Sequence, residues 1–226
     1  MQRITEPELM DDQAQSEAYA AADFAEAHSL IVDTFGRCFP GEDVAGQVLD
    51  LGCGPGDICF RFAARYPHCS VIGVDGSRAM IRLANARKVR ESVTGDRVRF
   101  IEGLLPGTAI PTAPFAAVIS NSLLHHLHEP GVLWETIIRV ASSGTKVYVA
   151  DLFRPGTVAE VRRLVNEYTA GEPDILQRDF YNSLRAAFEP HEVEAQLVAA
   201  GLAGLAVDVI SDHHLVVHGV IGTDHD

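Results

Sequence analysis

The stretch Val48-Leu49-Asp50-Leu51-Gly52-Cys53-Gly54-Pro55-Gly56-Asp57 indicates the fold of this 226-residue chain. A short apolar run enters a turn with glycine at every second position, and residues 58–66 then show helical periodicity that ends before a proline. Glycines let the backbone bend tightly and approach a ligand without interference from Cβ, and the next helix offers unpaired amides at its N-terminus. The stretch therefore predicts a strand, a ligand-binding loop and a helix.

Strands and helices are expected to alternate on both sides of this unit. Apolar runs predict strands over 70–74, 98–101, 115–120 and 146–150, and periodic segments predict helices over 77–89 and 131–140. Strands that are apolar on both faces imply a parallel sheet covered on two sides by right-handed crossovers. We therefore expect an α/β, doubly wound, mostly parallel seven-stranded sheet, with strands 205–210 and 214–220 forming a terminal antiparallel hairpin.

The length favours a single domain over residues 1–226. Its expected parts are an N-terminal helical cap (1–43), a cofactor-binding core (44–151), a helical lid insert (152–189) and a terminal helix with the hairpin (190–221). Two helices, over 157–169 and 174–188, make up the insert because they interrupt the strand–helix rhythm. The extreme N-terminus and residues 222–226 are expected to be disordered.

Charge and composition limit the partners. Thirty-one acidic against eighteen basic residues give a net charge of −13, which disfavours nucleic acid and anionic membranes. The acidic N-terminal region and the lack of long apolar runs predict a cytoplasmic protein. Four unevenly spaced cysteines favour packing roles over disulfides. We expect the substrate to be a small molecule and the protein to be a monomer or homodimer.

The spacing of the loop favours one class of nucleoside ligand. Its third glycine, Gly56, comes one residue too early for a dinucleotide-binding motif, and Asp57 stands where a small residue is needed, so an NAD(P)-binding oxidoreductase is the weaker alternative. Asp50 beside the loop favours a cationic partner, such as the ammonium group of a methionine moiety. Asp75 ends the next strand, where a carboxylate can accept both ribose hydroxyls.

At these residues the chain resembles the class I S-adenosylmethionine-dependent methyltransferases over about residues 44–220. It is most similar to the small-molecule branch that includes the ubiquinone and menaquinone C-methyltransferases, through Asp75-x-Ser77-x-x-Met80 and Asn121-Ser122-Leu123-Leu124-His125-His126-Leu127. The resemblance implies S-adenosylmethionine as cofactor, S-adenosylhomocysteine as product, and a cofactor site made by Asp50, Gly52, Cys53, Gly54, Gly56, Asp75, Gly76, Ser77, Met80, Gly103, Leu104, Ser120, Asn121 and Ser122. Leu104 replaces an aspartate common in the family, so main-chain contacts are expected there.

Residues for catalysis and acceptor binding follow from position along the chain. His125, His126 and Asp151 lie at strand ends, where open α/β sheets bind ligands, and are candidate catalytic residues or packing and capping residues. Whether a general base is needed depends on the acceptor. Candidate acceptor contacts are Tyr19, Phe24, His28, Arg154 and Tyr181. No metal site is expected, because no acidic or cysteine ligand follows the histidines at close spacing. A methyltransferase-like binding protein without turnover is the second alternative.

Overall fold

The computed structural model describes residues 1–22, 24–41, 43–91, 93–112 and 114–222. Its elements, in chain order, are α1 (Gln13–Ala21), α2 (Ala25–Cys38), β1 (Gly46–Leu51), α3 (Asp57–Arg65), β2 (Cys69–Asp75), α4 (Arg78–Lys88), η1 (Gly95–Arg97), β3 (Val98–Glu102), β4 (Phe115–Asn121), η2 (Leu124–His126), α5 (Gly131–Val140), β5 (Lys146–Leu152), α6 (Val158–Tyr168), α7 (Asp174–Ala186), α8 (Pro190–Ala199), β6 (Ala206–Val209) and β7 (His214–Val220). The expected disorder of residues 223–226 falls outside the described residues.

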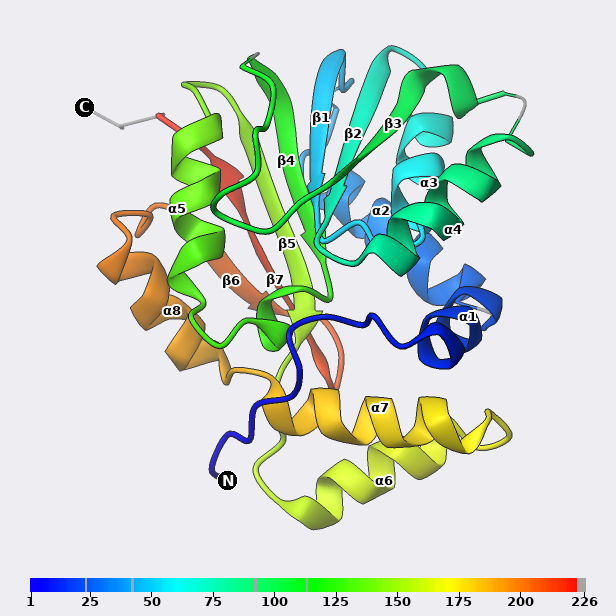
Figure 1. Ribbon diagram of the computed structural model, residues 1–226. Helices are drawn as coiled ribbons and strands as arrows, with labels where there is room; N and C mark the ends of the chain where they lie inside the picture. Colours follow the sequence, from blue (N-terminus) through cyan, green and yellow to red (C-terminus); the bar gives the residue numbers. More distant parts are fainter. Residues whose placement is uncertain (23, 42, 92, 113, 223–226) are drawn as a thin grey trace.

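The seven strands form one sheet in the order β3-β2-β1-β4-β5-β7-β6 (Figure 1). Strands β1 to β5 are parallel to one another, and β7 pairs antiparallel with both β5 and β6. The strand order reverses between β1 and β4, so the connections leaving these two strands diverge and open a crevice at their carboxyl ends. The expected doubly wound sheet with a terminal hairpin is confirmed.

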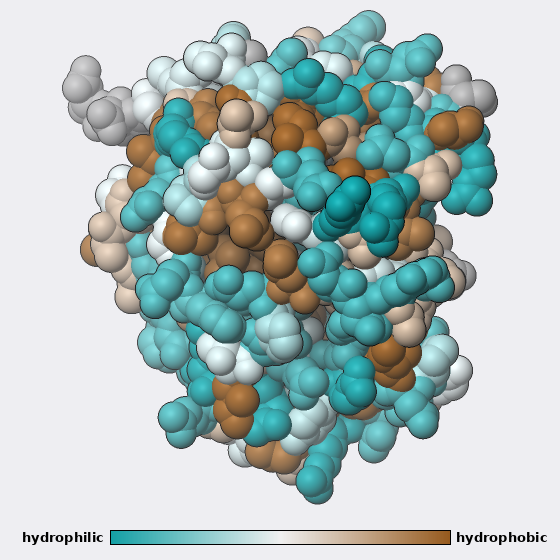
Figure 2. Space-filling model, viewed as in Figure 1, coloured by the Kyte–Doolittle hydropathy of each residue, from teal (hydrophilic) through white to brown (hydrophobic). Residues whose placement is uncertain are grey.

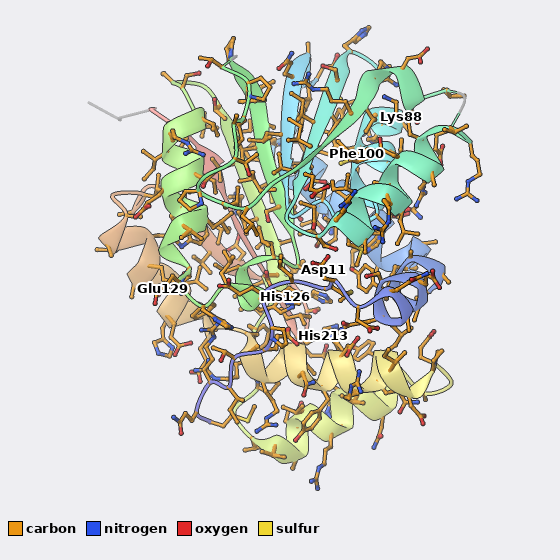
Figure 3. The ribbon with its side chains drawn as sticks, in the orientation of Figure 1. Asp11, Lys88, Phe100, His126, Glu129 and His213 are labelled. Atoms are coloured by element: carbon orange, nitrogen blue, oxygen red, sulfur yellow. The ribbon has the colours of Figure 1, made fainter. Side chains whose placement is uncertain are left out.

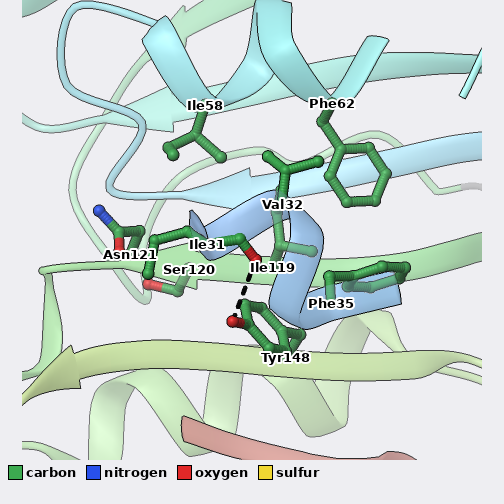
Figure 4. A pocket seen from close by; sticks show the side chains of 9 residues that line it. All are labelled: Ile31, Val32, Phe35, Ile58, Phe62, Ile119, Ser120, Asn121 and Tyr148. Atoms are coloured by element: carbon green, nitrogen blue, oxygen red, sulfur yellow. Dashed lines mark hydrogen bonds between the residues drawn. The ribbon is translucent and has the colours of Figure 1, made fainter. Parts of the chain in front are cut away.

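Two apolar layers cover the sheet. On one face, α2 and α3 bury Phe35 and Phe62, and on the other, α5 and α8 bury Trp134 and Leu197. The hydroxyl of Tyr148 on β5 donates to the carbonyl of Ile31 at 3.2 Å, which ties α2 to the sheet. Figure 4 shows this bond beside a cavity of about 10 Å³, too small for a ligand. The second half of the expected N-terminal cap is therefore part of the core.

Helices α6 and α7 lie beyond the carboxyl edge of the sheet (Figure 1). They pack on each other through Val161, Leu164 and Leu184, in a small apolar cluster separate from the two main layers. Their outer surface is mainly hydrophilic, as Figure 2 shows for this face of the molecule. No helix among the described residues is long and apolar enough to cross a membrane.

Residues 1–12, which we call the N-terminal strap, run between the sheet edge and α7 (Figure 1). The guanidinium of Arg3 donates to the carbonyls of Ala186, His125 and Leu127 at 2.5, 3.0 and 2.9 Å, and lies 3.8 Å from the ring centroid of Phe188. The expectation of a disordered N-terminus is wrong, because these contacts satisfy carbonyls at the ends of separate elements.

Candidate active site

The loop after β1 depends on glycine at its last position. Gly56 precedes α3 with a φ of +83°, and a Cβ there would lie 2.6 Å from Cζ of Phe100. Both the left-handed conformation and the close approach of the ring exclude a side chain. Gly56 itself is buried and does not line the large pocket described below. Its role is therefore to shape the loop, while Gly52 and Gly54 expose their backbone to the pocket.

Asp75 joins the loop to the next helix. Its Oδ2 accepts from the backbone N–H of Gly54 at 2.8 Å, and its Oδ1 accepts from that of Ser77 at 2.8 Å. Burial raises the pKa of Asp75 despite these two bonds. Each carboxylate oxygen keeps a further lone pair, so the side chain can also accept ribose hydroxyls.

Asp50 lies beneath the loop with 1% of its surface exposed. The thiol of Cys59 on α3 donates to its Oδ2 at 3.1 Å. Burial raises the pKa of Asp50 to about 7, since a thiol is a weak donor and compensates little of the lost hydration. A cationic ligand beside this carboxyl group would favour its ionised form.

One pocket of about 920 Å³ runs from the glycine loop to α7. It is lined by most of the expected cofactor residues: Asp50, Gly52, Cys53, Gly54, Asp75, Gly76, Ser77, Met80, Gly103, Leu104, Asn121 and Ser122. Ser120 does not line it, and instead donates to the carbonyl of Leu51 at 2.7 Å and borders the small cavity of Figure 4.

Backbone strain marks the end of β4. Ser122 has a φ of +54°, and it is the one non-glycine residue with positive φ in the described part of the chain. A serine in the left-handed region costs conformational energy, and such residues concentrate at ligand sites. Its N–H donates to the carbonyl of Ala150 on β5 at 3.0 Å, which holds the strained turn against the pocket.

The N-terminal strap covers the pocket beside Gly76 and Ser77, which sequence reasoning missed. A Cβ on Gly76 would lie 2.9 Å from Leu9 and 2.6 Å from Leu104, so both leucines sit over this glycine. Oγ of Ser77 lies 2.9 Å from the carbonyl oxygen of Met10. Leu9 and Met10 line the pocket. The polar composition of residues 1–15 carried no signal of this, because the contacts join the strap to residues more than sixty positions away.

Aromatic side chains at the α1–α2 connection form one wall. Tyr19 and Phe24 have ring centroids 4.9 Å apart, Phe24 and His28 are 5.3 Å apart, and all three line the pocket as expected for acceptor contacts. His28 Nδ1 lies 2.7 Å from Oδ2 of Asp57, which also binds Arg61 at 2.5 Å. Burial opposes ionisation of Asp57, but these bonds outweigh it and hold its pKa below the usual range.

The insert contributes one helical face to the opposite wall. Leu176, Asp179, Phe180 and Ser183 of α7 line the pocket at helical spacing. Tyr181, an expected acceptor contact, lies off this face, with Arg185 5.2 Å from its ring centroid, and does not line the pocket.

The structure also places Arg154 away from the pocket lining. The side chain is 5% exposed and donates to the carbonyl of Ala187 at 2.7 Å and to Glu189 and Glu192 at 3.0 and 2.9 Å. These partners fill its donors, so Arg154 anchors the start of α8 rather than facing an acceptor.

The candidate catalytic residues meet at the carboxyl edge. His125 Nδ1 lies 2.5 Å from Oδ1 of Asp151, and both side chains are buried. Burial favours the neutral imidazole, but the charge of Asp151 outweighs it and raises the pKa of His125. Asp151 therefore occupies Nδ1 of His125 and fixes the orientation of its ring.

His126 stacks on His125 with ring centroids 4.2 Å apart. Burial and the charge of His125 lower the pKa of His126 to about 3. Both histidines line the pocket, together with His213 on the β6–β7 connection. Figure 3 shows His126 and His213 between the sheet edge and α7.

Glu6 of the N-terminal strap completes this group. Its Oε1 lies 3.5 Å from Nε2 of His125 and 3.3 Å from Nδ1 of His126, and it accepts from Ser183 at 2.9 Å. Burial raises the pKa of Glu6. Sequence reasoning missed this residue because more than a hundred positions separate it from the histidines and no local motif surrounds it.

The comparisons with known proteins agree with this geometry. Residues 48–144 match the family described as methyltransferase domain. An uncharacterised methyltransferase of Mycobacterium tuberculosis is 34% identical over 36% of this chain and 38% of its own, and a trans-aconitate 2-methyltransferase of Methylobacterium nodulans is 27% identical over 78% of this chain and 67% of its own. The chain thus spans about two fifths of the length of the mycobacterial relatives it matches.

Solved structures share the fold across nearly the whole chain. A putative S-adenosylmethionine-dependent methyltransferase of Methanococcus maripaludis has a TM-score of 0.70 at 19% identity, covering 95% of both chains. The plantazolicin methyltransferase BpumL, solved with S-adenosylhomocysteine, has a TM-score of 0.68 at 15% identity, covering 92% of this chain and 90% of its own. Residues 48–144 thus match a methyltransferase domain, and the chain as a whole shares its fold with solved methyltransferases.

Proposed function

We propose that this protein transfers the methyl group of S-adenosylmethionine to a small-molecule acceptor. The observation that carries the proposal is that Asp50, the glycine loop and Asp75 line the same 920 Å³ pocket as the aromatic wall and α7. The first set suits the cofactor, and the remaining volume suits an acceptor of modest size. The relatives named for trans-aconitate support a small acceptor of this kind.

The residues of the cofactor half fit the parts of S-adenosylmethionine. Asp50 would pair with the ammonium group, Asp75 would accept the ribose hydroxyls, and Met80 with Leu104 would pack against the base. When bound, the cofactor supplies a methyl group that its sulfonium already activates. The chain's own task is then to align the acceptor with that methyl group and to exclude water.

The acceptor half would do this with few polar groups. Tyr19, Phe24 and Phe180 provide apolar surface, while His126 and Ser183 offer hydrogen bonds. Because Asp151 occupies Nδ1 of His125, we infer that this histidine orients its neighbours.

Extract labelling tests the proposed function. Purified protein is incubated with methyl-labelled S-adenosylmethionine and a small-molecule extract, and the products are separated by chromatography. Label on an extracted compound, lost with the Asp75→Ala variant, is the expected result. Cofactor binding without any labelled product would instead support a binding protein without turnover, and preferential binding of NAD would support the oxidoreductase alternative.

We further propose that the N-terminal strap, α1 and the α6–α7 insert form the lid of the pocket. Hydrogen exchange should slow in residues 1–21 and 157–188 when S-adenosylhomocysteine is added, while α2 keeps the same protection, because its Phe35 side is part of the core. Equal exchange of both lid segments with and without ligand would contradict the lid.

A further inference from the structure

Three side chains with metal-binding atoms converge where the N-terminal strap crosses η2. The Glu6 carboxylate, the His125 imidazole and the His126 imidazole place one donor atom each within 4.8 Å of one another. Glu6 lies on the strap, whereas both histidines lie after β4, so the group exists only in the folded chain.

The spacing of these atoms matches the spacing of ligands around one ion. Glu6 Oε1 lies 3.5 Å from His125 Nε2 and 3.3 Å from His126 Nδ1. Nitrogen and oxygen atoms bound at about 2.0–2.1 Å in tetrahedral geometry lie roughly 3.3–3.4 Å from each other. Both distances from Glu6 are therefore close to the separation of two ligands on one ion, and the third pair lies within 4.8 Å.

Outer contacts hold two of the three side chains in a binding orientation. Asp151 lies 2.5 Å from His125 Nδ1, and a proton shared there leaves the Nε2 lone pair free to face Glu6. Ser183 on α7 donates to Glu6 Oε1 at 2.9 Å. Carboxylate and hydroxyl partners behind the ligands are typical of protein metal sites.

In the third side chain, one ring nitrogen lacks a hydrogen-bond partner. His126 Nδ1 is buried, and no donor or acceptor completes a hydrogen bond with it. An unsatisfied buried nitrogen costs free energy unless a ligand occupies it. The atom lies on the side of the ring that approaches Glu6.

From this geometry we propose that Glu6, His125 and His126 bind a divalent transition-metal ion such as Zn²⁺. Two imidazoles and one carboxylate suit zinc and its first-row neighbours, and leave at least one coordination position open. Because both histidines line the large pocket, that position faces the acceptor half. Metal binding itself does not depend on methyl transfer.

The consequence for the substrate rests on the proposed function. An open position on the ion binds an oxygen of the acceptor, such as a hydroxyl or carboxylate, and holds it against the methyl donor. The acceptor class is thus an oxygen-bearing small molecule able to coordinate a metal.

Zinc titration tests the site. Untagged protein is stripped with a chelator and titrated with Zn²⁺ by calorimetry, and Co²⁺ is added to a second sample to record its visible absorption. One ion per chain and a tetrahedral Co²⁺ spectrum are expected. Glu6→Gln and His126→Gln should each weaken zinc binding at least tenfold, and Asp151→Asn should weaken it about 10- to 100-fold.

Matched variants separate this site from incidental binding. Glu8→Gln lies on the same strap, and His191→Gln removes an exposed histidine; both should bind zinc like the unaltered chain. All variants are checked for S-adenosylhomocysteine binding, which shows that they fold. Unchanged zinc affinity in folded Glu6→Gln, or a metal content equal to that of a Glu6→Gln/His126→Gln double variant, overturns the proposal. Zinc binding without any methylated product would leave the site standing and count against the proposed function alone.

Discussion

Substitution of Asp75 by alanine should weaken cofactor binding while the fold persists. The carboxylate accepts two backbone N–H groups at 2.8 Å each, and its remaining lone pairs face the pocket. Hydrogen bonds to a charged group contribute about 1.5–3 kcal/mol each, and the two contacts to the ribose share one carboxylate. We expect a net loss of about 2–3 kcal/mol, which corresponds to a roughly 30- to 150-fold higher Kd.

Calorimetry with S-adenosylhomocysteine measures this change directly. Asp96→Asn, at an exposed position in η1, removes a carboxylate elsewhere and should leave the Kd unchanged. Circular dichroism and the midpoint of urea unfolding report whether Asp75→Ala still folds, since the side chain also supports the loop at Gly54. A folded Asp75→Ala protein whose Kd lies within threefold of the original would refute the assignment of this carboxylate to the cofactor.

Three further outcomes are expected. Cofactor affinity should fall about fivefold from pH 7 to pH 6, because the pKa of Asp50 is about 7 and only its ionised form pairs with an ammonium group. An Asp50→Asn variant whose affinity changes with pH in the same way would contradict this assignment. Gly56→Ala should lower the free energy of unfolding by about 2–4 kcal/mol in urea titration through backbone strain and overlap, whereas Gly131→Ala, with open space around its Cβ position, should not. Phe35→Ala should lower the free energy of unfolding by about 3–5 kcal/mol in the same assay, because this ring is fully buried. A decrease below about 1 kcal/mol would show that α2 is not part of the core.

The fold followed from patterns that are local in the chain. Apolar runs of strand length, helical periodicity between them and the glycine spacing at 52, 54 and 56 are each satisfied within about ten residues. The path of the N-terminal end was harder to predict. The strap reads as polar coil, yet Arg3 binds three carbonyls that only the folded chain brings together.

For the proposed cofactor half of the site, the sequence by itself predicted that Asp50 and Asp75 lie at one edge of the sheet. Asp50 and Asp75 end neighbouring parallel strands, so their positions along the chain place them at one edge of the sheet. The residues of the proposed acceptor half could not be predicted in this way, because they are brought together by packing between distant segments. Arg154 has the chain position of an acceptor contact, but its guanidinium turns to Glu189 and Glu192 because buried charge requires partners.

The tertiary structure alone decided which groups meet at the acceptor end. Spacing reports which side chains share a strand or a helix face, because these repeats are fixed by backbone geometry. It does not report the path of an irregular segment, because that path depends on contacts with residues distant in the chain. Glu6 reaches His125 and His126 in that way, and the candidate metal site therefore has no signature in the sequence.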